Sequence, residues 1–258
     1  MANPQTRFRS ISFPSRSQPT NFETQLKKPK SCEVDPISSQ AIQSGLLDLA
    51  NYVQNLTQST NYVHQDIKSI EQSLSGSIEL LDSWGAIKEL FQMMKENVHA
   101  LQSAIRRKGL EYNSNIQNDI NSYICIRKRM SKCISKTLKT LKNLENENLD
   151  VTGPTIALFK SVLGFLSCPA GRSGGWNLVS RLMMVKSVDR AMSEVRCVDS
   201  VLGAIRNGDS NKGVDLQMVL RSLQNLDDCV EGIELGLQRL FRQLMHFRVM
   251  LLNIVTDH

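Results

Sequence analysis

LQMVLRSLQNLDDCVEGIELGLQRLFRQLMHFRVMLLNIVT, residues 216–256, is the stretch that decides the fold. Apolar residues recur through it at steps of three and four without a polar interruption. A helix places such a series along one side, and the series is too long for a strand or a loop. At 1.5 Å per residue the helix is about 60 Å long, so it needs partner helices along its whole length. The series consists of Leu216, Val219, Leu223, Leu226, Val230, Ile233, Leu237, Leu240, Leu244, Phe247, Leu251 and Ile254.

The residues beside this stripe distinguish a multi-helix bundle from a dimeric coiled coil. With Leu216 as heptad position a, the flanking e and g positions include the apolar residues Leu220, Phe241, Met250 and Val255. A two-stranded coiled coil usually carries complementary charges there, whereas a helix within a larger bundle has a wider apolar face. The sequence therefore favours an intramolecular bundle and a monomer, although it does not fix the oligomeric state.

The same spacing predicts further helices upstream. We expect two short helices between residues 38 and 75, separated by a turn at 57–61, and then a long helix that begins at Gly76-Ser77 and ends at residues 106–108. More helices are expected over about 113–144, 152–166 and 176–205, before the turn-rich segment 207–213. The predicted fold is all-α: an elongated multi-helix bundle with long antiparallel helices over residues 37–258 and a flexible loop at 167–175.

Composition limits the class of protein. A chain of 258 residues can bury a core without disulfides. Its six cysteines form no CxxC pair, and no histidine stands at ligand spacing from them, so we expect reduced, mostly buried thiols and no metal site. No secretory signal opens the chain and no apolar run is long enough to span a membrane, which predicts a cytoplasmic protein. The cysteines are Cys32, Cys125, Cys133, Cys168, Cys197 and Cys229.

Residues that could support catalysis are scattered along the chain. No nucleophile elbow, glycine-rich fingerprint, HExxH motif or paired-carboxylate arrangement is present. The four histidines lie on separate segments, without the companions that catalysis or metal binding requires. We therefore expect a non-enzymatic protein with no catalytic residues and no cofactor. The histidines are His64, His99, His246 and His258.

Residues 1–36 form a predicted disordered tail, basic and rich in Ser and Pro, with five of the seven prolines and six basic residues against three acidic ones. Within it, Arg9, Ser10, Ser12 and Pro14 match the Arg-Ser-x-phosphoSer-x-Pro pattern that 14-3-3 proteins bind. Phosphate adds about two negative charges for an arginine cluster to bind, and Pro14 turns the chain out of the binding groove. The same Arg- and Ser-rich start also resembles an organelle transit peptide, which leaves a chloroplast location as an alternative.

The helix expected at 113–144 carries the most concentrated charge in the chain. Its basic residues have no acidic residue between them, which suits an anionic membrane surface or an acidic protein partner. Nucleic acid is a poorer fit, because aromatic residues for base stacking are missing. The alternative is a solvated face, or pairing with the acidic residues Asp227, Asp228, Glu231 and Glu234. The candidate contacts are Arg127, Lys128, Arg129, Lys132, Lys136, Lys139 and Lys142.

Several stretches resemble the plant-specific BYPASS-type family of helical proteins. They are RSISFPSRSQP at 9–19, GSIELLDSWGAIKELFQMMKENVHALQSAIRRKG at 76–109, YICIRKRMSKCISKTLKTLK at 123–142 and LQRLFRQLMHFRVMLLNI at 237–254. Members often have His where this chain has Gln18. The resemblance implies a plant protein associated with root and shoot development, located in the cytoplasm, at membranes or in the chloroplast. It brings no catalytic residues and no ligand.

Overall fold

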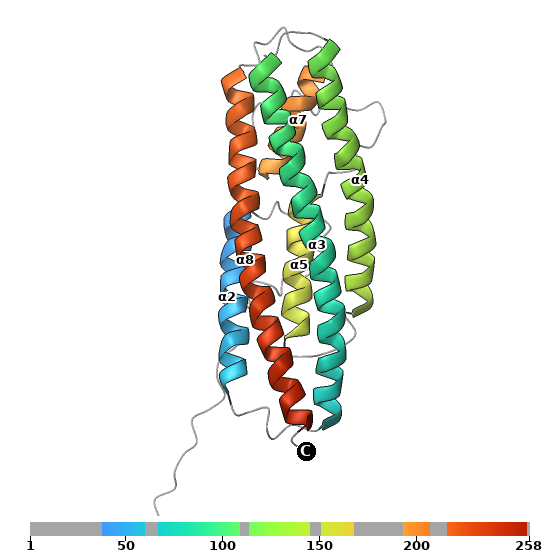
Figure 1. Cartoon of the computed structure of the whole chain (residues 1–258), viewed down its shortest axis with the longest axis vertical. Coiled ribbons are helices and arrows are strands. Elements are labelled where there is room, and N and C mark those ends of the chain that lie inside the picture. The colour runs from blue at the N-terminus through green and yellow to red at the C-terminus, as the bar shows by residue number, and fades with distance from the viewer. Residues whose placement is uncertain are drawn as a thin grey trace, which may run out of the picture. The chain divides into compact units, whose positions relative to one another are not determined.

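The computed structural model describes residues 38–59, 67–108, 114–144, 151–167, 193–206 and 216–256 (Figure 1). The chain divides into two units, Met1–Ser31 and Cys32–His258, and every described residue belongs to the second. No strand occurs in these ranges, so the all-α prediction is confirmed. The helices are α2 (Ser39–Gln58), α3 (Ile67–Lys108), α4 (Ser114–Leu144), α5 (Thr152–Leu166), α7 (Glu194–Arg206) and α8 (Leu216–Thr256).

Helix α8 is the stretch whose apolar stripe predicted a bundle. Ten of the twelve stripe positions are buried, and the two half-buried ones, Leu216 and Ile254, lie at its ends. Helices α2, α3 and α7 pack against α8. Phe241, one of the flanking apolar residues, stacks on Trp84 of α3 with ring centroids 4.0 Å apart. The apolar flanks of the stripe therefore contact neighbouring helices of the same chain.

Helices α2 and α7 cover α8 one after the other (Figure 1). They meet at their N-terminal ends, where the hydroxyl of Ser39 donates a hydrogen bond to Glu194 Oε1 at 2.7 Å. Helix α5 contacts α2, α3 and α4, and most of its residues are buried, as expected for a short apolar helix. Two helices of 20 and 13 residues thus share the length of the 41-residue α8.

The predicted break at Gly76-Ser77 is wrong, because α3 runs without interruption from Ile67 to Lys108. Glycine disfavours a helix by about 1 kcal/mol relative to alanine, but tertiary contacts override that preference here. Gly76 and Ser77 are buried, and Arg248 of α8 donates hydrogen bonds from Nη1 to the Leu74 carbonyl at 2.6 Å and to Ser77 Oγ at 2.5 Å. The contact with α8 stabilises the continuous helix at this point.

The other expected helices are placed as follows. Those at 113–144 and 152–166 are confirmed as α4 and α5. Of the helix expected at 176–205, the described residues include only the part that belongs to α7, and of the expected loop at 167–175 they include only Ser167. The predicted tail, residues 1–36, lies outside the described residues.

Two glycines on α8 allow α2 to approach closely. A Cβ atom on Gly236 would lie 3.0 Å from Leu46 Cδ1 and 3.1 Å from Leu46 Cβ. A Cβ atom on Gly232 would lie 2.6 Å from Nε2 of Gln43, the flexible end of a long side chain. Because Leu46 is fully buried and cannot move aside, Gly236 is the position that sets the distance between the two helices.

We predict that Gly236→Ala lowers the free energy of unfolding by about 1 kcal/mol or more, because the new methyl group overpacks the contact with Leu46. Gly203→Ala is the matched control, since nothing lies within 4 Å of its Cβ position. That substitution should raise the free energy of unfolding by about 0.5–1 kcal/mol through helix propensity alone. Urea unfolding of both variants measures the difference, and equal shifts would contradict the close packing.

Candidate functional site

The predicted basic residues of α4 separate into an exposed group and one buried residue. Six are exposed and lie within about 140° of one another around the helix axis at 100° per residue, opposite the buried apolar residues. They extend over about 21 Å of helix. We refer to these six residues as the basic face; they are Lys128, Arg129, Lys132, Lys136, Lys139 and Lys142.

The charge of the basic face is not neutralised by the described part of the chain, in which none of the six residues forms an ion pair. The alternative pairing with the acidic residues of α8 is not formed among the described residues, because Asp227 and Glu234 contact α3 and Asp228 accepts a hydrogen bond from Gln224 of its own helix. Asp227 contacts His99 at 2.9 Å and Glu234 contacts Lys95 at 3.0 Å. The hydrogen bond from Lys95 to Glu234 and the charge of Glu234 raise the pKa of Lys95 above its usual value. Among the described residues, the basic face therefore has no anionic partner.

Arg127 is a correction to the predicted contact set, because only 3% of its side chain is exposed. Its guanidinium donates hydrogen bonds to Asp199 of α7, with Nη2 to Oδ2 at 3.0 Å, and to the Leu166 carbonyl at the end of α5, at 2.9 Å. Tyr123 adds a hydrogen bond from its hydroxyl to Asp199 Oδ1 at 3.0 Å. Arg127 therefore joins α4, α5 and α7 from inside the bundle and cannot contact an external surface.

The sequence contained a signal for this burial. Position 127 follows Tyr123 by four residues and precedes Met130 by three, so it lies on the apolar stripe of α4 rather than on its outer side. The neighbouring Lys128 and Arg129 obscured that register, because a run of three cations suggests a common surface. Periodicity therefore favoured a buried Arg127, while its half-buried partner Asp199 became evident only from the structure.

The cysteines also differ from expectation. Among the described residues, Cys125 and Cys133 are exposed and Cys197 and Cys229 are half-buried, all as free thiols, so the prediction of mostly buried thiols is wrong for these four. Burial raises the pKa of the Cys229 thiol above its ordinary value. Within the described ranges no three His, Cys, Asp or Glu side chains gather in a way that could hold a metal ion.

The predicted phosphorylation motif cannot be placed, since Arg9, Ser10, Ser12 and Pro14 lie outside the described residues. In the part of the chain that the structure describes, no helix has both the length and the apolar character to cross a membrane.

Comparison with known proteins gives one match. Residues 44–254 match the family model described as Protein BPS1, and this range includes the described helices from α3 to α7, most of α2 and nearly all of α8. Neither the curated proteins nor the solved structures contain a match to this chain.

We predict that Arg127→Met destabilises the fold by about 3–5 kcal/mol, because it leaves the Asp199 carboxylate and the Leu166 carbonyl without their cationic donor. Lys128→Met is the control, since it removes a neighbouring exposed cation and should change the free energy of unfolding by less than about 0.5 kcal/mol. Urea unfolding followed by circular dichroism compares the two variants. Similar small effects from both would show that the Arg127 contacts contribute little to stability.

Proposed function

The chain belongs to the BPS1 family, and on that premise we propose that it is a non-enzymatic regulatory scaffold of plant development, acting in roots and shoots by binding protein partners. The observation that carries this proposal is the basic face of α4. Six exposed cations occupy one side of a helix with no acidic residue among them and no ion pair in the described chain. Such a surface attracts a partner of opposite charge over long distances and orients it before contact.

An acidic protein surface is the occupant that the composition of this face favours. An anionic membrane would gain about 1 kcal/mol for each basic residue near its surface. Peripheral proteins usually add apolar side chains that enter the lipid, yet the exposed large apolar residues of the described chain lie on α2, α3 and α8 and not on α4. Binding to anionic lipid through the basic face remains the alternative function, and it would rest on electrostatics alone.

The N-terminal tail supplies the regulatory part of the proposal. Ser12 follows Arg9 by three residues and precedes Pro14 by two, the spacing of a 14-3-3 ligand once Ser12 is phosphorylated. The unmodified segment is basic, so the phosphate would reduce the local positive charge as well as create a ligand. In this proposal, the protein binds one class of partner through α4 and a second class through the phosphorylated tail.

We predict that neutralising the centre of the basic face removes specific partners from proximity labelling of the tagged full-length protein in plant cells. Loss of four cations from the basic face weakens its electrostatic attraction to an acidic partner. Loss of four cations from other exposed positions leaves that attraction at the basic face intact. Labelling also reports whether the protein resides in the cytoplasm, at a membrane or in the chloroplast. The test variant carries Lys128→Gln, Lys132→Gln, Lys139→Gln and Lys142→Gln. The control loses the same charge from other exposed positions, through Lys68→Gln, Arg106→Gln, Arg107→Gln and Arg221→Gln.

The result separates the two occupants. Loss of acidic proteins in the test variant and not in the control supports the scaffold. Flotation of the wild-type protein with phosphatidylserine vesicles, abolished in the test variant and by raised salt, would favour the membrane alternative. Identical partner sets for all three proteins would contradict a role for the basic face.

We predict that full-length protein with phosphoserine at position 12 binds a 14-3-3 protein and that the unmodified protein does not, because the phosphate provides the charge that the arginine cluster of 14-3-3 recognises. Fluorescence anisotropy with labelled 14-3-3 protein measures the affinity. Phosphoserine at Ser10 is the control, since it adds the same charge two residues before the position at which the motif requires the phosphate. Equal binding of both phosphoproteins, or of neither, would reject the motif.

A further inference from the structure

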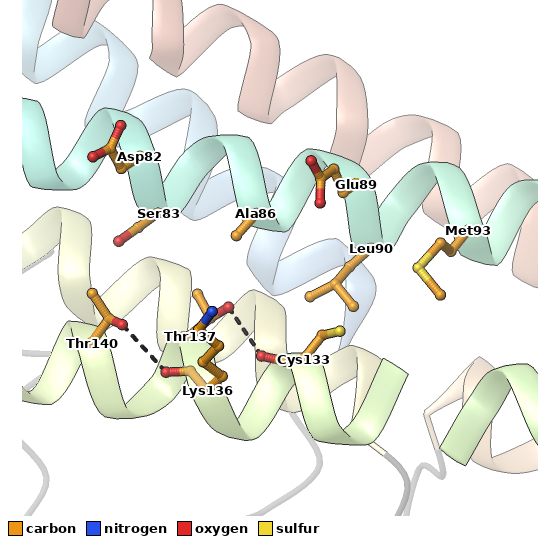
Figure 2. Close-up of a pocket in the computed structure, with 10 residues that line it drawn as sticks. All are labelled: Asp82, Ser83, Ala86, Glu89, Leu90, Met93, Cys133, Lys136, Thr137 and Thr140. Carbon is orange, nitrogen blue, oxygen red and sulfur yellow. Dashed lines mark hydrogen bonds between the residues drawn. The ribbon is translucent and has the colours of Figure 1, made fainter. Parts of the chain in front are cut away.

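Two adjacent hollows lie between α3 and α4 on the same side of both helices. Their volumes are about 370 and 250 Å³, and Met93 lines both. Figure 2 shows the larger one, where Ser83, Ala86 and Leu90 of α3 face α4. Further along the same boundary the smaller hollow is lined by residues that include Leu101 of α3 and Ile126 of α4. We refer to the two hollows together as the α3–α4 groove.

The floor of the larger hollow is mainly apolar, although the buried hydroxyl of Ser83 has no hydrogen-bond partner, whereas Asn97 and Ser122 make the smaller hollow more polar. Ala86, Leu90 and Met93 follow one another at steps of four and three along α3. On α4, Thr137 donates its hydroxyl hydrogen to the Cys133 carbonyl at 3.1 Å, and Thr140 donates to the Lys136 carbonyl (Figure 2). The threonine methyl groups and the apolar side chains together make a floor suited to another apolar stripe.

The two rims of the groove carry opposite charges at the spacing of a helical heptad. On α3 the rim consists of Asp82, Glu89 and Glu96, seven residues apart. On α4 it includes Arg129 and Lys136, also seven residues apart, while the half-buried Asp119 lines the far end of the smaller hollow. All five side chains are exposed. Seven residues correspond to two helical turns, so each rim presents its charges in a line parallel to the groove.

These opposite charges do not meet across the groove. In the described ranges none of the five rim residues forms an ion pair, and Glu96 instead accepts a hydrogen bond from Gln92 of its own helix at 3.0 Å. On the opposite side of α3, in contrast, Asp227 and Glu234 of α8 do pair with residues of α3. The rim charges are thus left for a third element that lies between them.

We propose that the α3–α4 groove binds an amphipathic α-helix of a partner protein. The helix would place an apolar stripe along the floor, a basic flank beside the acidic rim of α3, and an acidic flank beside the basic rim of α4. This is the arrangement of flanking charges in coiled coils and of helices bound in apolar grooves. The residues of α3 that line the two hollows are centred about ten residues apart, or about three helical turns, so large apolar side chains about eleven residues apart on the partner fill one hollow each.

The charge pattern excludes the other common occupants. An anionic membrane or a nucleic acid would be repelled by the three carboxylates of the α3 rim. A small molecule would occupy one hollow and leave the second rim segment without a partner. The inference rests on the proposed scaffold function and names the kind of partner segment, while it concerns a groove beside the basic face rather than the centre of that face.

The test uses full-length protein and three synthetic helical peptides, each about three heptads long with the same leucine stripe. One has a lysine flank, one a glutamate flank, and one glutamine at all flanking positions. Fluorescence anisotropy measures their affinities for the wild-type protein and for Glu89→Lys and Lys136→Glu, which reverse one charge on each side of the larger hollow. Glu79→Lys and Lys68→Glu are matched controls, because both residues are exposed, line neither hollow and lie outside the basic face.

We expect a crossed pattern of effects. Glu89→Lys should weaken the lysine peptide about tenfold and leave the glutamate peptide unchanged, whereas Lys136→Glu should do the reverse. The control variants should bind both peptides as the wild type does, and both charged peptides should bind more tightly than the glutamine peptide. Circular dichroism and urea unfolding confirm that the exposed substitutions leave the fold intact.

Two exposed cysteines on α4 locate the bound peptide without further substitution. Cys133 lines the larger hollow, whereas Cys125 lines neither. A peptide with one stripe leucine replaced by cysteine, supplied as its mixed disulfide with a small thiol, should exchange onto Cys133 and release that small thiol, as peptide mapping by mass spectrometry would show. Absence of binding to the wild type, equal effects of groove and control variants, coupling to Cys125, or occupation of the groove by a second copy in sedimentation would each overturn the proposal. If the groove proposal failed but the proximity-labelling result still depended on the basic face, the proposed scaffold function would remain supported.

Discussion

The apolar stripe of α8 is the constraint on which the rest of the bundle depends. Ten of its positions, spread along a helix of 41 residues, are buried against neighbouring helices. Burying each large apolar side chain contributes about 1.5–3 kcal/mol to the free energy of folding. No single short helix can cover that length. Helix α3 covers one side continuously, while α2 and α7 divide the other and meet at Ser39 and Glu194. The close approach allowed by Gly236 and the bonds from Arg248 to α3 follow from the same requirement.

The charges of α4 illustrate how one helix serves both the core and the surface. Its single buried cation, Arg127, holds the end of α5 and the middle of α7, and the cost of removing that charge from water is offset by Asp199 and a backbone carbonyl. The six remaining cations point outward. Replacement of Arg127 would therefore disturb packing, whereas replacement of its neighbours would alter recognition, although only its position on the apolar stripe distinguishes Arg127 in the sequence.

Periodicity was sufficient to predict the helices because each must bury a stripe, and the spacing of apolar residues records that stripe directly. It could not predict that α3 continues through Gly76, because the stabilising bonds come from Arg248, 172 residues away in the chain. It missed the groove for a similar reason. Asp82, Glu89 and Glu96 look like ordinary solvated positions until the structure shows which side of α3 adjoins α4. The exposure of Cys125 and Cys133 likewise depends on the orientation of α4 and not on residue type.

Arg129 and Lys136 belong both to the basic face and to the rim of the groove. A helix in the groove would neutralise these two cations and leave four for any ligand of the face. An acidic ligand that drew the same two side chains outward would in turn remove one flank of the groove. Thermodynamic linkage makes this antagonism equal in both directions. Ligands of the basic face and of the groove would then compete, and each ligand would lower the affinity of the protein for the other without a change in fold.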